Sequence, residues 1–284
     1  MRVRILGSAA GGGVPQWNCA CAGCRTARAT GVHRTQDGVA VTGDGSAWYL
    51  LNASPDVRAQ LLAAPELAPG PGRRDTPVRG VVLTTAELDH AAGLLMLREA
   101  GALTVCGTGA VLDTLRTDLP LLPALARYTS LRVRCLTPGE PLDLDGGLTV
   151  RALAVGSKRP RYARGEPAGE RVCALRVSDA RGRAFVYATC LPEWTEAFDA
   201  FLAGADAALL DGTFATADEP ARVAGLARTP REMGHLPIAG MLEAVRRHPG
   251  TRCLFGHLNN TNPYAHGGAV GPVEIAADGL TLAL

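Results

Sequence analysis

Asp89, His90 and His257 are candidate ligands of a single metal ion. Asp89 and His90 stand in "TTAELDHAAGLL", where an apolar run gives way to a helical pattern, and His257 follows the apolar run "CLFG". If both runs are core strands, their ends bring one carboxylate and two imidazoles together. Two histidines and one carboxylate leave coordination positions open, as in non-heme Fe(II) oxygenases. The alternative for the first pair is an N-cap Asp beside a surface His.

A further histidine, His235, directly precedes a helical run in "REMGHLPIAGMLEA". We assign it to the same site, as a general acid/base or an additional ligand. A capping role at the start of the helix would also explain its position.

Three thiols lie within six residues in "WNCACAGC", a spacing typical of a structural zinc site. They are Cys19, Cys21 and Cys24. Packed thiols or a redox site are the alternatives. The fourth ligand could be His266, His33 or Asn260, and we prefer His266 because it lies in the polar turn after His257. The other cysteines stand singly in apolar contexts, as reduced core thiols do.

Basic residues supply candidates for substrate binding. The segment 156–171, "GSKRPRYARGEPAGER", carries Lys158 and Arg161, and Arg58 follows a strand in "LLNASPDVR". The segment is either a solvated loop or a lid that binds carboxylates, which Arg recognises well. The glycine run "GSAAGGGVPQW" predicts a loop that closely approaches the site, with Gln16 and Trp17 as walls of the pocket.

The order of elements predicts an α/β sandwich of two sheets with helices on the outer faces. A hairpin is expected around residues 43–46, because two β-rich runs flank a Gly-Asp-Gly-Ser turn. Further strands are expected at 78–84, 103–107, 148–155, 172–178, 183–189, 207–213 and 251–256. Helices are expected at 55–64, 91–100, 109–118, 192–203 and 237–248, with a loop at 65–77.

Composition narrows the class of protein. The chain has 284 residues, an apolar fraction of 47% and a net charge of +2, which gives no electrostatic case for a nucleic-acid partner. Apolar runs are shorter than a membrane span, and the N-terminus has the pattern of a strand rather than a signal peptide. With its unpaired thiols, the chain is expected in the cytoplasm.

Taken together, these segments resemble the coenzyme PQQ biosynthesis protein B (PqqB) family. The segments that carry the resemblance are "RILGSAAGGGVPQWNCACAGC", "LLNASPDVRAQL", "AELDHAAGLLMLREA", "REMGH" and "HLNNTNP". A looser similarity is to the metallo-β-lactamase superfamily, which implies one αββα domain over residues 1–284. In its His-x-His-x-Asp-His motif, Thr85 and Glu87 replace the two histidines of the first metal position. The position of the bridging acid falls near Cys190, which is not a carboxylate.

The resemblance implies a mononuclear iron enzyme that hydroxylates the tyrosine of a Glu–Tyr-derived precursor in PQQ biosynthesis. Zn or Mn could occupy the same ligands in the isolated protein. Two alternatives are a carrier of PQQ or its precursor toward the periplasm and a hydrolase such as a phosphodiesterase. Contacts with other PQQ biosynthesis proteins and a homodimer remain open at this point.

Overall fold

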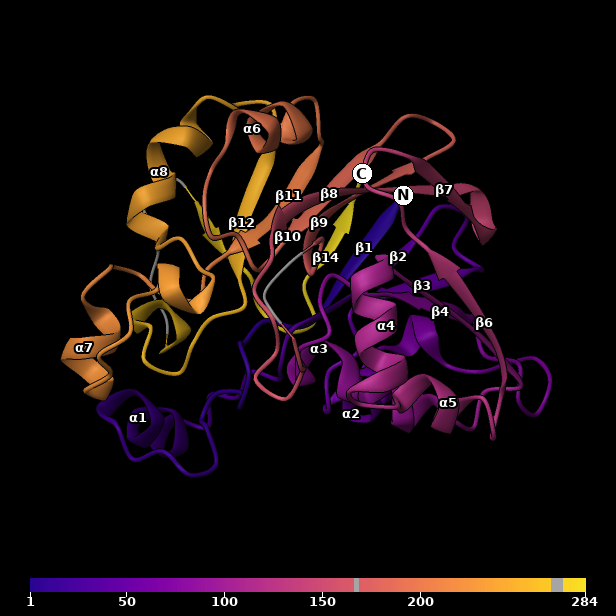
Figure 1. Ribbon diagram of the computed structural model, residues 1–284, viewed down its shortest axis with the longest axis horizontal. Helices are drawn as coiled ribbons and strands as arrows, with labels where there is room; N and C mark the ends of the chain where they lie inside the picture. The colour runs from indigo at the N-terminus through magenta and orange to yellow at the C-terminus, as the bar shows by residue number, and fades with distance from the viewer. Residues whose placement is uncertain (166–168, 267–272) are drawn as a thin grey trace.

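The computed structural model describes residues 1–165, 169–266 and 273–284 (Figure 1). It contains two seven-stranded sheets that pack face to face, with helices on their outer sides, so the expected αββα sandwich is confirmed. Parts of two segments discussed above lie outside the described residues. They are residues 166–168 of the basic segment and residues 267–272 after His266.

The first sheet is antiparallel at one edge and parallel at the other. From β14 to β3 neighbouring strands are antiparallel, and from β3 to β6 they are parallel. The expected hairpin is the pair β2–β3. In spatial order the strands are β14 (Thr281–Ala283), β1 (Arg2–Gly7), β2 (Gly38–Thr42), β3 (Trp48–Leu51), β4 (Val78–Val82), β5 (Ala102–Gly107) and β6 (Ser130–Cys135).

The second sheet repeats this plan. Its strands β13 to β10 are parallel, and β10 to β7 are antiparallel. In spatial order they are β13 (Glu274–Ile275), β12 (Arg252–Gly256), β11 (Ala207–Asp211), β10 (Ala184–Ala188), β9 (Val172–Asp179), β8 (Leu148–Gly156) and β7 (Pro141–Leu144).

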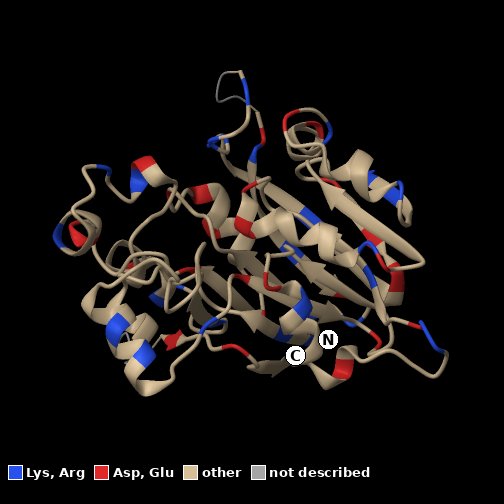
Figure 2. Ribbon diagram, turned by 90° about the horizontal axis from the view of Figure 1, so that it is seen from below, with Lys and Arg blue, Asp and Glu red and all other residues tan. Residues whose placement is uncertain are grey.

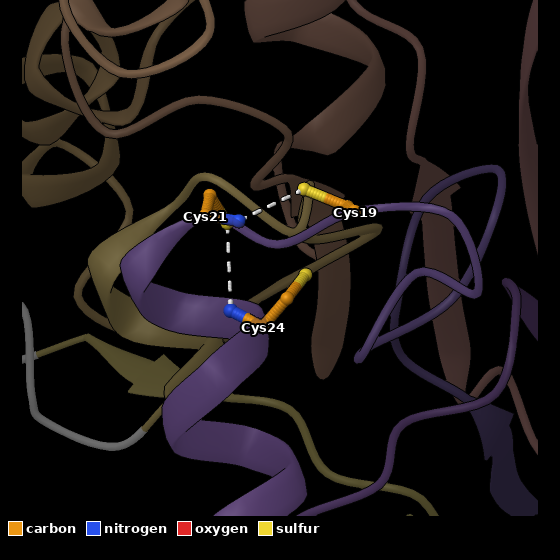
Figure 3. Close-up of side chains that lie close together, drawn as sticks. All are labelled: Cys19, Cys21 and Cys24. Carbon is orange, nitrogen blue, oxygen red and sulfur yellow. Dashed lines mark hydrogen bonds between the residues drawn. The ribbon is translucent and has the colours of Figure 1, made fainter.

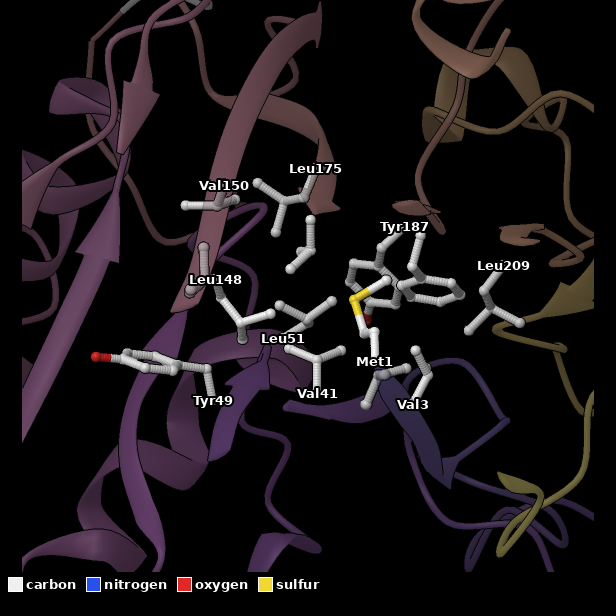
Figure 4. Close-up of a cluster of buried hydrophobic side chains, with 14 of the residues drawn as sticks. Met1, Val3, Val41, Tyr49, Leu51, Leu148, Val150, Leu175, Tyr187 and Leu209 are labelled. Atoms are coloured by element: carbon white, nitrogen blue, oxygen red, sulfur yellow. The ribbon is translucent and has the colours of Figure 1, made fainter. Parts of the chain in front are cut away.

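Alternating side chains along the strands separate the inner core from the outer layers. In β10, Phe185 and Tyr187 face the other sheet, whereas Val186 and Ala188 face the helices, because successive strand residues point to opposite faces. Figure 4 shows the inner core, where side chains from both sheets interdigitate. Strands covered on both faces read as continuous apolar runs, which is why these segments were recognisable in the sequence.

Helices cover the two outer faces. On the first sheet, α2, α4 and α5 pack against strand residues such as Trp48 and Val105. On the second, α6 and α8 pack against residues such as Val186 and Phe255. The helices are α1 (Ala22–Thr30), α2 (Val57–Leu62), α3 (Leu88–Ala91), α4 (Gly109–Thr117), α5 (Leu121–Leu125), α6 (Glu196–Leu202), α7 (Glu219–Ala224) and α8 (Ile238–Arg246). Short 3₁₀ turns are η1 (Pro65–Leu67), η2 (Ala92–Leu97), η3 (Asp145–Gly147), η4 (Arg231–Met233) and η5 (Pro263–His266).

The prediction of one helix over residues 91–100 was wrong. The helix α3 ends at Ala91, and the segment that follows is the 3₁₀ turn η2. The backbone leaves the α-helical pattern because it bonds to the neighbouring loop: Ala53 N–H donates to His90 C=O, and Gly93 N–H donates to Ala53 C=O. A Cβ at Gly93 would lie 2.0 Å from Ser54 C=O, so this contact requires glycine.

Charged residues of both signs are interspersed over the molecule (Figure 2). Among the described residues, none of the helices has the length and apolar character needed to cross a membrane.

Candidate metal centre at the ends of the parallel strands

The candidate centre lies where parallel strands of both sheets end. Asp89 and His90 belong to α3, which follows β4, and His257 follows the last residue of β12. The register of β11 and β12 sets Asp211 opposite Gly256, so Asp211 ends beside His257. Open α/β sheets generally bind ligands at the carboxyl ends of their parallel strands.

The three predicted ligands meet in the structure. The Asp89 Oδ2 atom lies 3.4 Å from His257 Nε2 and 3.9 Å from His90 Nε2, and the two imidazole centroids are 5.3 Å apart. Ligand atoms that sit about 2.1 Å from a shared ion are separated by roughly 3–3.4 Å. The three side chains are therefore close enough to hold one ion after small adjustments.

Two buried nitrogens test whether a metal fits. His90 Nε2 and His257 Nε2 are buried and have no hydrogen-bond partner among the described residues. Their Nδ1 atoms are occupied: His90 Nδ1 contacts Thr85 Oγ1 at 2.9 Å, and His257 Nδ1 contacts Thr213 Oγ1 at 2.8 Å. Buried polar groups are rarely left unpaired, so the free Nε2 atoms fit a cation.

The tautomer of His257 follows from its hydrogen bonds. The Thr213 hydroxyl donates its single proton to Asp211 Oδ1 at 2.7 Å. Its oxygen must therefore accept from His257, which places the imidazole proton on Nδ1 and the free lone pair on Nε2. Metal-binding histidines are commonly oriented in this way by a neighbouring acceptor. His257 also adopts a φ of 55°, an uncommon left-handed conformation that aims its ring at the site.

Burial and charge at the site favour the metal-binding protonation states of Asp89 and His90, but not that of His257. Burial lowers the pKa of His90, against the charge of Asp89. Burial would raise the pKa of Asp89, but His90 and His257 hold it well below its usual range. For His257, burial would lower the pKa, but the contact with Asp89 and the charges of nearby carboxylates raise it. An ionised Asp89 and a neutral His90 are the forms that bind metal.

Cys190 is a soft donor that the sequence interpretation did not assign to the site. Ligand atoms of His90, Cys190 and His257 lie within 4.8 Å of one another. Burial, with the carboxylates of Asp211 and Asp89, raises the pKa of the Cys190 thiol well above its usual value. Coordination by this sulfur would therefore require a metal to displace its proton.

His235 is oriented by a carboxylate that sequence reasoning missed. Its Nδ1 lies 2.8 Å from Asp211 Oδ2, and its ring stacks on His257 with centroids 5.5 Å apart. Burial would raise the pKa of Asp211, but the charge and hydrogen bond of His235 lower it. The sequence pattern that could have identified Asp211 is its position at the end of the apolar run "AALLD", which matches the position of His257 after "CLFG".

A cleft of about 570 Å³ opens onto these side chains. Lys158 and Arg161, the predicted substrate-binding residues of the basic segment, line this cleft, and Arg228 is a basic lining residue that the sequence analysis did not select. Lys158 Nζ pairs with Glu87 Oε1 at 3.4 Å, so Glu87 does not contribute a metal ligand in this conformation. Arg58 lies exposed on α2 and is absent from the described lining of the cleft, so its part in substrate binding stays a prediction.

The glycine run approaches the site as expected, but its aromatic neighbour does not. A side chain at Gly11 would come 3.2 Å from Asp89 Oδ2, and both Gly11 and Gly12 line the cleft. The prediction that Gln16 and Trp17 wall the pocket was wrong, since neither is in its described lining. Trp17 is 85% exposed.

The cysteine cluster is a separate candidate site at the start of α1 (Figure 3). The sulfurs of Cys19, Cys21 and Cys24 lie within 4.8 Å of one another. The Cys21 sulfur caps α1 by accepting from Cys24 N–H at 3.4 Å. Burial alone would raise the pKa of the Cys21 thiol, but this hydrogen bond and the neighbouring thiols lower it. For Cys24, burial raises the pKa of the thiol.

The fourth ligand of this cluster stays a prediction. The Asn260 amide contacts all three sulfurs at 3.2–3.7 Å, and His266 Nε2 lies 3.0 Å from Asn260 C=O. His266 also packs on Gly23 of α1, where an added Cβ would meet its Nε2 at 2.1 Å. His266 Nδ1 is buried without a partner among the described residues, whereas His33 is exposed.

The amino-acid sequence is similar to a known protein family along most of its length. Residues 47–258 match the family model of the Beta-lactamase superfamily domain. The coenzyme PQQ synthesis protein B of Azoarcus sp. is 42% identical and covers 100% of both chains, and that of Cupriavidus necator is 42% identical over 99% of each.

Solved structures of other proteins share this fold. The crystal structure of Zn²⁺-bound PqqB from Methylobacterium extorquens has a TM-score of 0.90 and 35% identity, and each chain covers the other completely. A diphosphatase of the PhnP family, with a TM-score of 0.74 and 19% identity over 99% of this chain and 97% of that one, shares the fold alone. The chain therefore belongs to the coenzyme PQQ synthesis protein B family of the metallo-β-lactamase superfamily.

Proposed function

We propose that this chain acts in the biosynthesis of coenzyme PQQ as a mononuclear, iron-dependent hydroxylase of the tyrosine in a Glu–Tyr-derived precursor. The observation that carries the proposal is the meeting of Asp89, His90 and His257 at an open cleft, where neither histidine Nε2 atom has a hydrogen-bond partner among the described residues. Ferrous iron, when bound, would supply the one-electron and dioxygen chemistry that no protein side chain provides.

The neighbouring polar groups favour one ion over two. Thr85 contacts His90, and Glu87 pairs with Lys158, so the positions that hold the first metal in the superfamily motif are engaged elsewhere. Asp211 is also engaged: one oxygen accepts from the N–H and hydroxyl of Thr213, and the other from Leu191 N–H and His235. These contacts leave Asp211 better suited to orienting His235 than to bridging two ions.

The chain's own groups would bind substrate and move protons. Lys158, Arg161 and Arg228 line the cleft and can hold the carboxylates of a peptide-derived precursor. His235, held by Asp211, faces the same cleft and can take or return a proton at its free ring nitrogen. The precursor would thus lie between a basic rim and an acid/base group.

The test is reconstitution of the full chain with Fe(II) without oxygen, followed by addition of dioxygen and a Glu–Tyr-derived substrate. We expect a product that has gained oxygen, detected by mass, only when iron and dioxygen are both present. His257→Ala should abolish this product, whereas His248→Ala, a matched change at a histidine bound to Asp199 outside the site, should retain it.

Two other outcomes would replace the proposal. Turnover of a phosphodiester without dioxygen would identify a hydrolase. Tight binding of PQQ, with no dioxygen consumed in the presence of the precursor, would identify a carrier, which the basic cleft would also suit.

A further inference from the structure

Asp37 is a buried carboxylate beside the metal centre. It directly precedes β2 and has no exposed surface. Its Oδ2 atom accepts hydrogen bonds from the Tyr187 hydroxyl and, at 2.9 Å, from Thr189 Oγ1, both from β10 or its end. The same oxygen lies 3.6 Å from His90 Nε2. These contacts fix the carboxylate next to a predicted ligand atom.

The other oxygen of Asp37 is left unsatisfied. Asp37 Oδ1 is buried and has no hydrogen-bond partner among the described residues. Within the same part of the chain, the ion pairs give Asp37 no Lys or Arg partner. Burying an unpaired carboxylate is costly, and proteins normally compensate it with a cation or a metal.

Asp37 Oδ1, His90 Nε2 and His257 Nε2 are all buried and lack a hydrogen-bond partner among the described residues. The distance that ties Asp37 to the centre is the one from its Oδ2 atom to His90 Nε2. The 3.6 Å spacing between Asp37 Oδ2 and His90 Nε2 resembles the 3.4 and 3.9 Å spacings that link Asp89 to the two histidines. It is also close to the separation of roughly 3–3.4 Å expected for atoms that share one ion.

We propose that Asp37 is a further ligand of this ion, so that the centre contains two carboxylates and two imidazoles. The inference rests on the proposed metal centre and specifies its composition. Two ionised carboxylates would balance the charge of a divalent cation in a site closed to water on the side of Asp37. Tyr187 and Thr189 would serve as positioning residues that hold the carboxylate in place.

The test is a titration of Co(II) into apo protein whose cysteine cluster has first been filled with Zn²⁺. Asp37→Asn keeps the size of the side chain and an oxygen acceptor for Tyr187 and Thr189, but it removes the charge. We expect at least a tenfold weaker Co(II) affinity, together with a changed d–d absorption spectrum because one ligand is lost. Asp113→Asn, a matched change at an exposed carboxylate of α4 that pairs with Arg116 outside the site, should leave both the affinity and the spectrum as in the parent.

Several results would overturn the inference. A parental affinity in Asp37→Asn would do so, and so would a weaker affinity with an unchanged spectrum, since Asp37 would then act only through His90. If Asp37→Asn fails to fold, Asp37→Ser is used under the same criteria. His257→Ala tests the metal centre separately from the role of Asp37. If Co(II) binding is unaffected by His257→Ala, the metal centre itself is refuted.

Discussion

Replacing Thr213 by valine offers a direct test of how the centre is oriented. The Thr213 hydroxyl contacts Asp211 Oδ1 at 2.7 Å, His257 Nδ1 at 2.8 Å and His235 Nδ1 at 3.0 Å. Valine has nearly the same shape but cannot make these contacts. His257 Nδ1 then loses the partner that fixes its tautomer, and its ring can turn the free lone pair away from the ion.

The expected magnitudes follow from these contacts. Leaving buried polar groups unsatisfied costs about 1–3 kcal/mol, so Thr213→Val should lower the free energy of unfolding of the apo protein by that amount. Loss of a group that orients a metal-binding histidine weakens metal affinity by about 10–100-fold. The two effects should appear together, since one hydroxyl supplies both.

Two assays measure these effects. Urea unfolding of the apo protein gives the stability, and Co(II) competition with a chromophoric chelator, after Zn²⁺ has filled the cysteine cluster, gives the affinity. Thr213→Ser retains the hydroxyl and should keep the parental metal affinity. Thr213→Val with lower stability but parental affinity would refute the reasoning, because His257 would then be oriented without this hydroxyl.

Three further predictions concern the same site and the cysteine cluster. His257→Ala should abolish hydroxylation but leave the zinc of the cysteine cluster, as counted by metal analysis; loss of both metals would mean that the ligands are partitioned wrongly. Because burial and the carboxylates of Asp211 and Asp89 raise the pKa of the Cys190 thiol, the Co(II)-loaded, Zn²⁺-blocked protein should show no sulfur-to-cobalt charge-transfer absorption and Cys190→Ser should keep the parental spectrum; such a band in the parent, lost in the variant, would show that this sulfur binds the ion. Because the pKa of His257 is raised above its ordinary value of about 6.5, protons should compete with metal, so Co(II) affinity should fall as the pH is lowered through that raised pKa. An affinity that does not change over this range would contradict the assignment of His257 Nε2 as a ligand.

The sequence by itself determined the layers of the fold and the types of residue at the centre. Strands buried on both faces are recognisable as apolar runs. Polar residues that end or follow these runs, such as His257, indicate the edge of the sheet where a ligand site can form. Asp89 and His90 were identified for the same reason. The sequence wrongly predicted a continuous helix over residues 91–100, because the hydrogen bonds that interrupt it come from a loop some forty residues earlier.

Only the tertiary structure decided which other groups join these ligands. Asp37 reads as an ordinary turn residue in "RTQDGVAV", and nothing nearby in the chain marks it. It becomes part of the centre because Tyr187 and Thr189, about 150 residues later, close over it from the opposite sheet. Asp211 and His235 are similarly brought to His257 by strand register and by the loop before α8. Such contacts depend on how the two sheets pack against each other, and they join residues that are far apart in the sequence.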